Sequence, residues 1–328
     1  WPDNNCFFNG SANGLSDPDR AFKPMQGYPQ YHSTEAKTFL NTTIAAQTTS
    51  NPEASLKTAL DTLANHPNVG PFIGRQLIQR LVTSNPSPAY VRSVAQAFNN
   101  NGAGVRGDMK AVLKAVLMHP EARQQSNTAG KLREPVLRLS AFLRAFGHTS
   151  DSGRYRVGNT DSPATALGQS PMRAPSVFNF YRPGYIAPGT TSGAANLASP
   201  EMQIAHETSA AGYVNYMRDA VSLGVGASGN VVVNGSTVSR RDLQSPFTAE
   251  LALADQPAAL VDLVVDKLMA GNAPAALKTE ITTAITTVAI PALNSTGSNQ
   301  AAIDSAKRTR VNAAVLLVLA SPEFQVQK

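Results

Sequence analysis

The chain has 328 residues and a mass of 34.6 kDa, with 42% hydrophobic and only 15% charged residues. This composition excludes a highly charged disordered chain, and the longest apolar run, from Ala313 to Ala320, is much shorter than the ~18–20 residues that cross a bilayer. The net charge of +6 is uneven, because residues 1–182 hold 19 basic and 11 acidic side chains and residues 183–328 hold 9 and 11.

These numbers favour some partners over others. A basic half can attract an acidic partner. No dense Lys/Arg run or aromatic-interleaved basic motif is present, so we expect no nucleic-acid binding. The short apolar run predicts no membrane span. Cys6 is the only cysteine, which excludes an internal disulfide, a cysteine-based zinc site and covalent c-type haem through two cysteines.

The cellular location has only weak signals. Many Ser, Thr, Asn and Gln residues beside few charged ones suggest an extracytoplasmic protein, periplasmic or secreted. The chain begins Trp1-Pro2-Asp3, with no charged or apolar leader. We therefore expect a mature form or a piece of a longer protein.

The first part of the chain divides into a loop-rich segment and a helical block. Residues 1–52 are rich in the turn formers Gly, Asn, Pro and Asp. From residue 53 apolar side chains recur with the spacing of amphipathic helices up to residue 147, and His-Pro, Asn-Pro and Asn-Gly pairs separate the stripes. The short connections predict antiparallel neighbouring helices.

The rest of the chain continues this pattern after an irregular segment at 148–200. A helix is predicted over 201–222, where Pro200 and Glu201 suit a first turn, and further helices at about 257–270, 275–289 and 300–320. Asn-Gly between two β-rich runs predicts a hairpin at 231–238. The fold class is therefore mainly α, an irregular multi-helix assembly with one small β-hairpin, in which a helical domain at 53–328 shares one contiguous core.

The irregular segment at 148–200, here called the strap, contains the densest group of aromatic and basic side chains. Prolines stiffen its stretch from Ser170 onward. Its candidate binding residues are arginines that fork onto carboxylates and rings that offer contact area, namely Arg173, Phe178, Tyr181, Arg182 and Tyr185. Such a segment either lines a binding cleft or fastens one helical layer onto another.

Catalytic candidates are few, since the sequence contains no GxSxG, HExxH, P-loop or GxGxxG motif. On the expected helix at 201–218, Gln203 and His206 share a face with Ala210, Tyr213 and Met217, and that face looks buried. His206 is then either a hydrogen-bonded core histidine or, with Glu207 beside it, an acid/base or ligand group.

Two other polar groupings have structural explanations as well as functional ones. His32 and Glu35, with Asp17 and Asp19 upstream, could hold a divalent cation such as calcium, although their spacing matches no defined metal loop and such groups also cap turns. Glu134 and Arg138 have i, i+4 spacing and predict a surface ion pair.

Several stretches resemble the bacterial domain-of-unknown-function family 1800 (DUF1800). They are HPNVGPFIGRQLIQRLVTSNPSPAYVRSVAQAFNNNG, GDMKAVLKAVLMHPEAR, KLREPVLRLSAFLRAFG, SPMRAPSVFNFYRPGY and VLLVLASPEFQVQK, preceded by KTFLNTTI. They occur in the family's order over about residues 35–328, which corresponds to the C-terminal two-thirds of its members. The resemblance implies a helical, usually exported protein with a further N-terminal helical region, whose gene often neighbours that of family 1501. It transfers no catalytic residue.

Three functions remain open. The first is an exported helical binding or assembly subunit, with a family-1501-like exported protein or the additional N-terminal region as its partner. The second is an extracytoplasmic hydrolase or oxidoreductase with a site near His206, Arg173 and Arg182. The third is a divalent-metal-binding protein that uses Asp17, Asp19, His32 and Glu35.

Overall fold

The structure, a computed structural model, describes residues 11–12, 15–16, 24–124 and 130–327. It is mainly helical with four small antiparallel sheets among these residues, as the sequence predicts. Among them no helix has both the length and the apolar character needed to cross a bilayer.

The first part of the chain carries two short hairpins and then a run of helices. The elements are β1 (Ser11–Ala12), β2 (Leu15–Ser16), the 3-10 helix η1 (Pro29–Tyr31), β3 (Lys37–Phe39), β4 (Thr42–Ile44), α2 (Pro52–Asn65), α3 (Val69–Leu81), α4 (Pro88–Asn99), α5 (Met109–Met118) and α6 (Pro120–Arg123). Polar side chains cap the starts of α2, α4 and α5: Asn51 accepts from the Ala54 N–H, Ser87 from the Tyr90 N–H and Asp108 from the Lys110 N–H. The helical block therefore begins at Pro52, one residue before the predicted boundary.

The second part contains the strap and a larger helical group. Its elements are β5 (Lys131–Leu132), α7 (Pro135–Ala145), β6 (Thr149–Ser150), α8 (Thr191–Ala194), η2 (Pro200–Ile204), α9 (Glu207–Leu223), β7 (Val225–Val233), β8 (Ser236–Gln244), α10 (Thr248–Ala252), α11 (Pro257–Met269), α12 (Ala275–Thr286), α13 (Gln300–Ala320), α14 (Pro322–Gln325) and β9 (Val326–Gln327). Helices α11, α12 and α13 thus match the ranges predicted at about 257–270, 275–289 and 300–320 closely.

The predicted hairpin is confirmed and is longer than expected. Strands β7 and β8 pair antiparallel around Asn234 and Gly235, which both have positive φ as the turn requires, and Val233 pairs with Ser236. Strand β6 adds a third strand through Thr149 and Ser150. This pairing fixes the start of the strap to the hairpin.

The helix predicted over 201–222 is wrong at its start. Residues Pro200–Ile204 form η2 instead, and α9 begins only at Glu207 with His206 as its N-cap. The imidazole Nδ1 of His206 accepts from the Ser209 N–H, and the Ser209 hydroxyl accepts from the His206 N–H. This reciprocal pair competes with a continuous helix, so the chain turns between the two elements.

The buried apolar side chains form two clusters rather than the single core that we expected. The smaller cluster lies among α3, α4 and α5 and is built on Ile78, Tyr90, Val94, Phe98, Val112 and Val116. The larger one runs through α7, α9, α11, α12 and α13 and includes Phe142, Met217, Val264 and Val315. We call the part of the chain around the smaller cluster the first lobe and the part around the larger cluster the second lobe.

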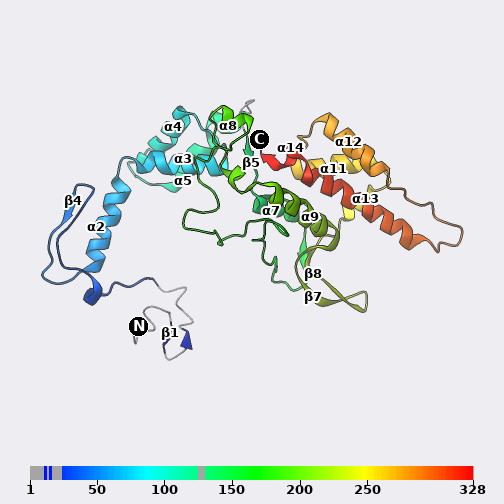
Figure 1. Cartoon of the computed structure of the whole chain (residues 1–328), viewed down its shortest axis with the longest axis horizontal. Coiled ribbons are helices and arrows are strands. Elements are labelled where there is room, and N and C mark those ends of the chain that lie inside the picture. Colours follow the sequence, from blue (N-terminus) through cyan, green and yellow to red (C-terminus); the bar gives the residue numbers. More distant parts are fainter. Residues whose placement is uncertain (1–10, 13–14, 17–23, 125–129, 328) are drawn as a thin grey trace.

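The two lobes lie side by side along the long axis of the molecule (Figure 1). Helices α3 to α5 occupy one end and α11 to α13 the other, while α2 and the β3–β4 hairpin extend beyond the first lobe. The strap and β5 lie between the lobes, and the end of the chain returns there, because β9 pairs with β5.

Tyr90 allows a test of the first lobe. Its hydroxyl donates to the Val116 carbonyl at 2.5 Å, and burial, with a smaller contribution from Glu121, raises its pKa to about 12. The neutral phenol therefore stabilises the fold fully below pH 10, and this contribution is lost as the pH rises towards 12, since the unfolded chain ionises first.

We expect Tyr90→Phe to lower the free energy of unfolding at neutral pH by about 1 kcal/mol and to remove part of the decline between pH 10 and 12. Urea denaturation over this pH range measures both effects. Tyr155→Phe is the control, because Tyr155 is exposed. Identical pH profiles of wild type and Tyr90→Phe would contradict the assignment.

Candidate functional site

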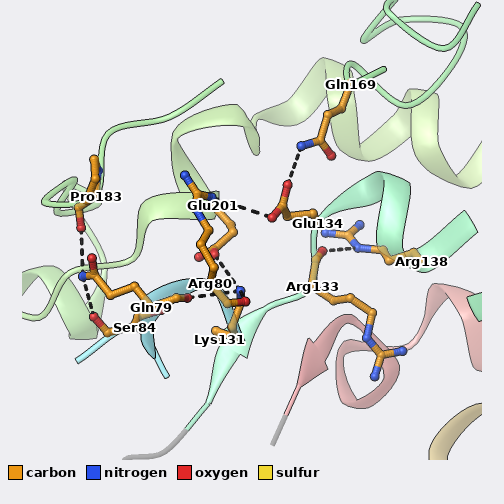
Figure 2. A network of polar contacts seen from close by, with 10 residues as sticks. All are labelled: Gln79, Arg80, Ser84, Lys131, Arg133, Glu134, Arg138, Gln169, Pro183 and Glu201. Atoms are coloured by element: carbon orange, nitrogen blue, oxygen red, sulfur yellow. Dashed lines mark hydrogen bonds and ion pairs between the residues drawn. The ribbon is translucent and has the colours of Figure 1, made fainter. Parts of the chain in front are cut away.

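The two lobes meet through a network of polar and charged side chains, which we call the junction (Figure 2). It gathers the end of α3, strand β5, the start of α7, the strap and η2. Its ion pairs join Arg80 to Glu134 and Lys131 to Glu201.

Lys131 is the centre of the junction. Its ammonium donates to the carbonyls of Gln79 at 3.2 Å and Arg80 at 2.7 Å, in the last turn of α3, and lies 3.2 Å from the Glu201 carboxylate. The Lys131 and Glu201 side chains are 0% and 2% exposed. A cation at the negative end of a helix is favourable, and here it also neutralises a carboxylate that has left water.

Amide side chains extend the junction into the strap. The Gln79 amide donates to the carbonyls of Ser84 at 2.9 Å and Pro183 at 3.1 Å. Asn85 and Ala198 exchange two hydrogen bonds of 2.9 Å each, one in each direction. The first lobe therefore binds the strap backbone directly through side-chain amides.

Arg80, which is half-buried, covers the buried ring of Tyr181 at one side of the junction. The Arg80 guanidinium lies 4.3 Å from the centre of the Tyr181 ring and 3.7 Å from a Glu134 oxygen. The other Glu134 oxygen accepts from the Gln169 amide at 2.6 Å. Burial, then the Glu134 carboxylate, raises the pKa of Tyr181, so its hydroxyl stays protonated at neutral pH.

The junction joins the lobes, and the space between the end of α3 and η2 is too small for a substrate. The space lined by Gln79, Arg80, Pro183 and Glu201 admits no water-sized sphere. Buried charges can be catalytic only where a reactant can reach them. The contacts of the junction connect the strap and η2 to the end of α3.

The strap is also fastened to the second lobe. The Asp242 carboxylate of β8 accepts from the N–H groups of Ser152 and Arg156 and from the Ser150 hydroxyl, each at 2.8 Å. Burial opposes its ionisation, but these donors outweigh burial and hold the pKa of Asp242 far below its usual range. Gly212 of α9 lies so close to the strap that a Cβ at this position would be 2.1 Å from the Pro163 carbonyl oxygen.

Between these attachments, residues 171–179 of the strap are exposed at every position. We call this stretch the strap loop. Met172 is fully exposed, Val177 is 95% exposed and Phe178 is 73% exposed. Met172 has a φ of 61°, in the left-handed region that a residue with a side chain rarely adopts. The loop thus presents apolar side chains to solvent from a strained backbone.

The predicted binding residues divide into surface and interior groups. Arg173 is exposed and pairs with Asp161 at 2.6 Å, and Arg182 is exposed while its backbone N–H donates to Gln203. Tyr185 is half-buried. Tyr181 is only 2% exposed, so we remove it from the binding surface and assign it to the junction.

His206 and Glu207 are exposed, and the prediction of a buried His206 is wrong because this residue precedes α9 rather than lying on its inner face. The His206 imidazole accepts from the Ser209 N–H, whereas the Arg173 guanidinium donates to Asp161. A catalytic role for His206 and Glu207 stays a prediction that these contacts do not support.

The metal prediction falls partly outside the described residues, which do not include Asp17 and Asp19. His32 Nδ1 lies 3.1 Å from the Ser50 hydroxyl, and the N–H of the exposed Glu35 donates to Ser33. The described part of the chain contains no group of three or more His, Cys, Asp or Glu side chains suited to a metal ion. Metal binding by these four residues stays a prediction.

The junction itself was missed in the sequence. Glu134 contacts Arg80 and Gln169, and the predicted partner Arg138 is buried, where it donates to the Arg133 carbonyl and stacks on Tyr213. The expected surface ion pair is therefore wrong. The available signal was that Lys131 and Glu134 lie just before a helix that begins at Pro135.

Comparisons with known proteins agree with the resemblance. The sequence model of the family described as "Protein of unknown function (DUF1800)" matches residues 9–326, which extends the resemblance towards the first residues. No curated protein and no solved structure matches the chain.

Replacing Lys131 with Met tests the junction. We expect Lys131→Met to lower the free energy of unfolding by about 3–5 kcal/mol, because it leaves the Glu201 carboxylate buried without its cation. Urea denaturation measures the change. Lys57→Met, which breaks the exposed Lys57–Asp61 pair, should cost less than about 1 kcal/mol.

The double variant Lys131→Met/Glu201→Leu distinguishes charge burial from loss of packing. It should recover much of the stability lost in Lys131→Met, since both charges are then gone. A double variant as unstable as the sum of its single changes would contradict the ion pair.

Asp242→Asn tests the attachment of the strap to β8. We expect faster amide exchange at Ser152 and Arg156, because the anionic acceptor is lost. In the wild type the carboxylate stays ionised above the ordinary aspartate pKa of about 4. The same acceleration should therefore appear only at lower pH, as the pH falls through the depressed pKa of Asp242 in the folded protein. Hydrogen-exchange mass spectrometry measures both, with the exposed Asp262→Asn as the control.

Proposed function

We propose a binding and assembly role for this chain, which belongs to the family described as "Protein of unknown function (DUF1800)". In this proposal the strap loop binds a protein partner. The observation that supports it most directly is the exposure of Met172, Val177 and Phe178 on a segment that both lobes hold in place.

The energetics favour recognition over a purely structural loop. Large apolar side chains in water give up stabilisation that burial would provide, at about 25 cal/mol per Å². Aromatic, Met and Arg side chains are enriched in interface centres. A loop whose ends are fixed also loses little conformational entropy when it binds.

The charges around the loop indicate the chemistry of the partner. Arg154, Arg156 and Arg182 are exposed elsewhere in the strap, and Arg173 lies within the loop. An apolar pocket with acidic residues at its rim would complement them. An exported protein of family 1501, or the N-terminal region that the resemblance implies, is the partner we expect, in the periplasm or outside the cell.

The triple variant Met172→Ser/Val177→Ser/Phe178→Ser tests the proposal. We expect native purification followed by size-exclusion chromatography with light scattering to give a complex for the wild type and a 34.6 kDa monomer for the variant. Circular dichroism and the melting temperature should not change, since none of these side chains is buried.

Val232→Ser/Leu293→Ser is the matched control, because it removes exposed apolar side chains outside the strap. It should keep the complex. A wild-type chain that elutes as a monomer, or a triple variant that retains the complex, would overturn the proposal.

A further inference from the structure

A second surface lies on the first lobe, in a groove between α3 and α4. The groove has a volume of about 580 Å³, within the size range of ligand sites. Pro71, Pro86, Pro88 and Val91 supply apolar walls. It is separate from the strap loop, whose residues do not line it.

Two arginines give the groove its charge. Arg75 of α3 and Arg92 of α4 line it, both are exposed, and neither forms an ion pair with a residue in the described part of the chain. Residues 62–107 contain four arginines and no acidic residue. The other two arginines are engaged, Arg80 in the junction and Arg106 with Asn99 and backbone carbonyls.

The helices that carry these arginines are held rigidly. Gly70 and Gly74 face α4, where a Cβ on Gly74 would lie 3.0 Å from Val94. This close packing fixes the separation of the two helix backbones before a ligand arrives. Binding then has to order only the arginine side chains.

The shape of the groove favours a chain over a small anion. Its lining runs along α4 from Pro88 to Asn99, about 16 Å at the rise of an α-helix. That length matches about five residues of extended peptide. Gln96 places an amide along it that can bond a peptide backbone, and guanidinium groups fit carboxylates bidentately.

We propose that the α3–α4 groove binds an extended acidic peptide segment of a partner protein, with Arg75 and Arg92 on its carboxylates and the prolines and Val91 against its apolar side chains. This site would add a second point of attachment to an assembly subunit. It stands independently of the strap loop.

Fluorescence anisotropy with a labelled hexapeptide of alternating Glu and Leu tests this inference on the full chain. We expect saturable binding that Arg75→Gln/Arg92→Gln weakens at least about tenfold, since each guanidinium contributes a charge-assisted bond. The same peptide with Gln in place of Glu should not bind.

Two controls make the result specific. Arg144→Gln, which removes an exposed arginine from α7, and the triple strap-loop variant should both bind the acidic peptide like the wild type. The inference is overturned if Arg75→Gln/Arg92→Gln binds as tightly as Arg144→Gln, or if inorganic phosphate displaces the peptide as well as unlabelled peptide does. Loss of partner in the strap-loop variant with retained peptide binding would separate the two sites.

Discussion

The buried contact between Lys131 and Glu201 constrains the rest of the molecule. Two apolar clusters that do not merge can still hold a fixed relative position if something directional joins them, and hydrogen bonds and ion pairs are directional where apolar packing is not. Lys131 of strand β5 provides this connection, because its ammonium donates to the carbonyls of Gln79 and Arg80 in the last turn of α3 and also lies beside the Glu201 carboxylate of η2. Removing charge from water costs free energy, so the junction provides geometry more than stability.

The strap gains its position from this arrangement. The first lobe binds its backbone through Gln79 and Asn85, and the second lobe binds it through Asp242 and the close approach of Gly212. A segment with so little regular structure would otherwise sample many conformations. Fixed at both ends, it can keep apolar side chains in water at its middle, which is the property that our functional proposal depends on.

The sequence predicted the parts that depend on periodicity and local turn chemistry. Apolar spacing located the helices of both lobes, and Asn234-Gly235 located the hairpin. It did not predict the junction, because Arg80, Lys131 and Glu201 lie far apart in the chain and each has an ordinary local explanation. Tyr181 and Phe178 illustrate the same limit: three positions apart in one aromatic stretch, one is buried under Arg80 and the other faces solvent.

The pairing of β9 with β5 has a consequence for the order of folding. Helices α3 to α5 contact one another over short sequence distances and can pack while the chain is still being synthesised. Lys131 lies in a strand whose neighbour is Gln327, so the ladder beside the ion pair cannot close until that residue has left the ribosome. A chain cut short before β9 would therefore lack the strand that pairs with β5, and Lys131 would lie in an unpaired segment.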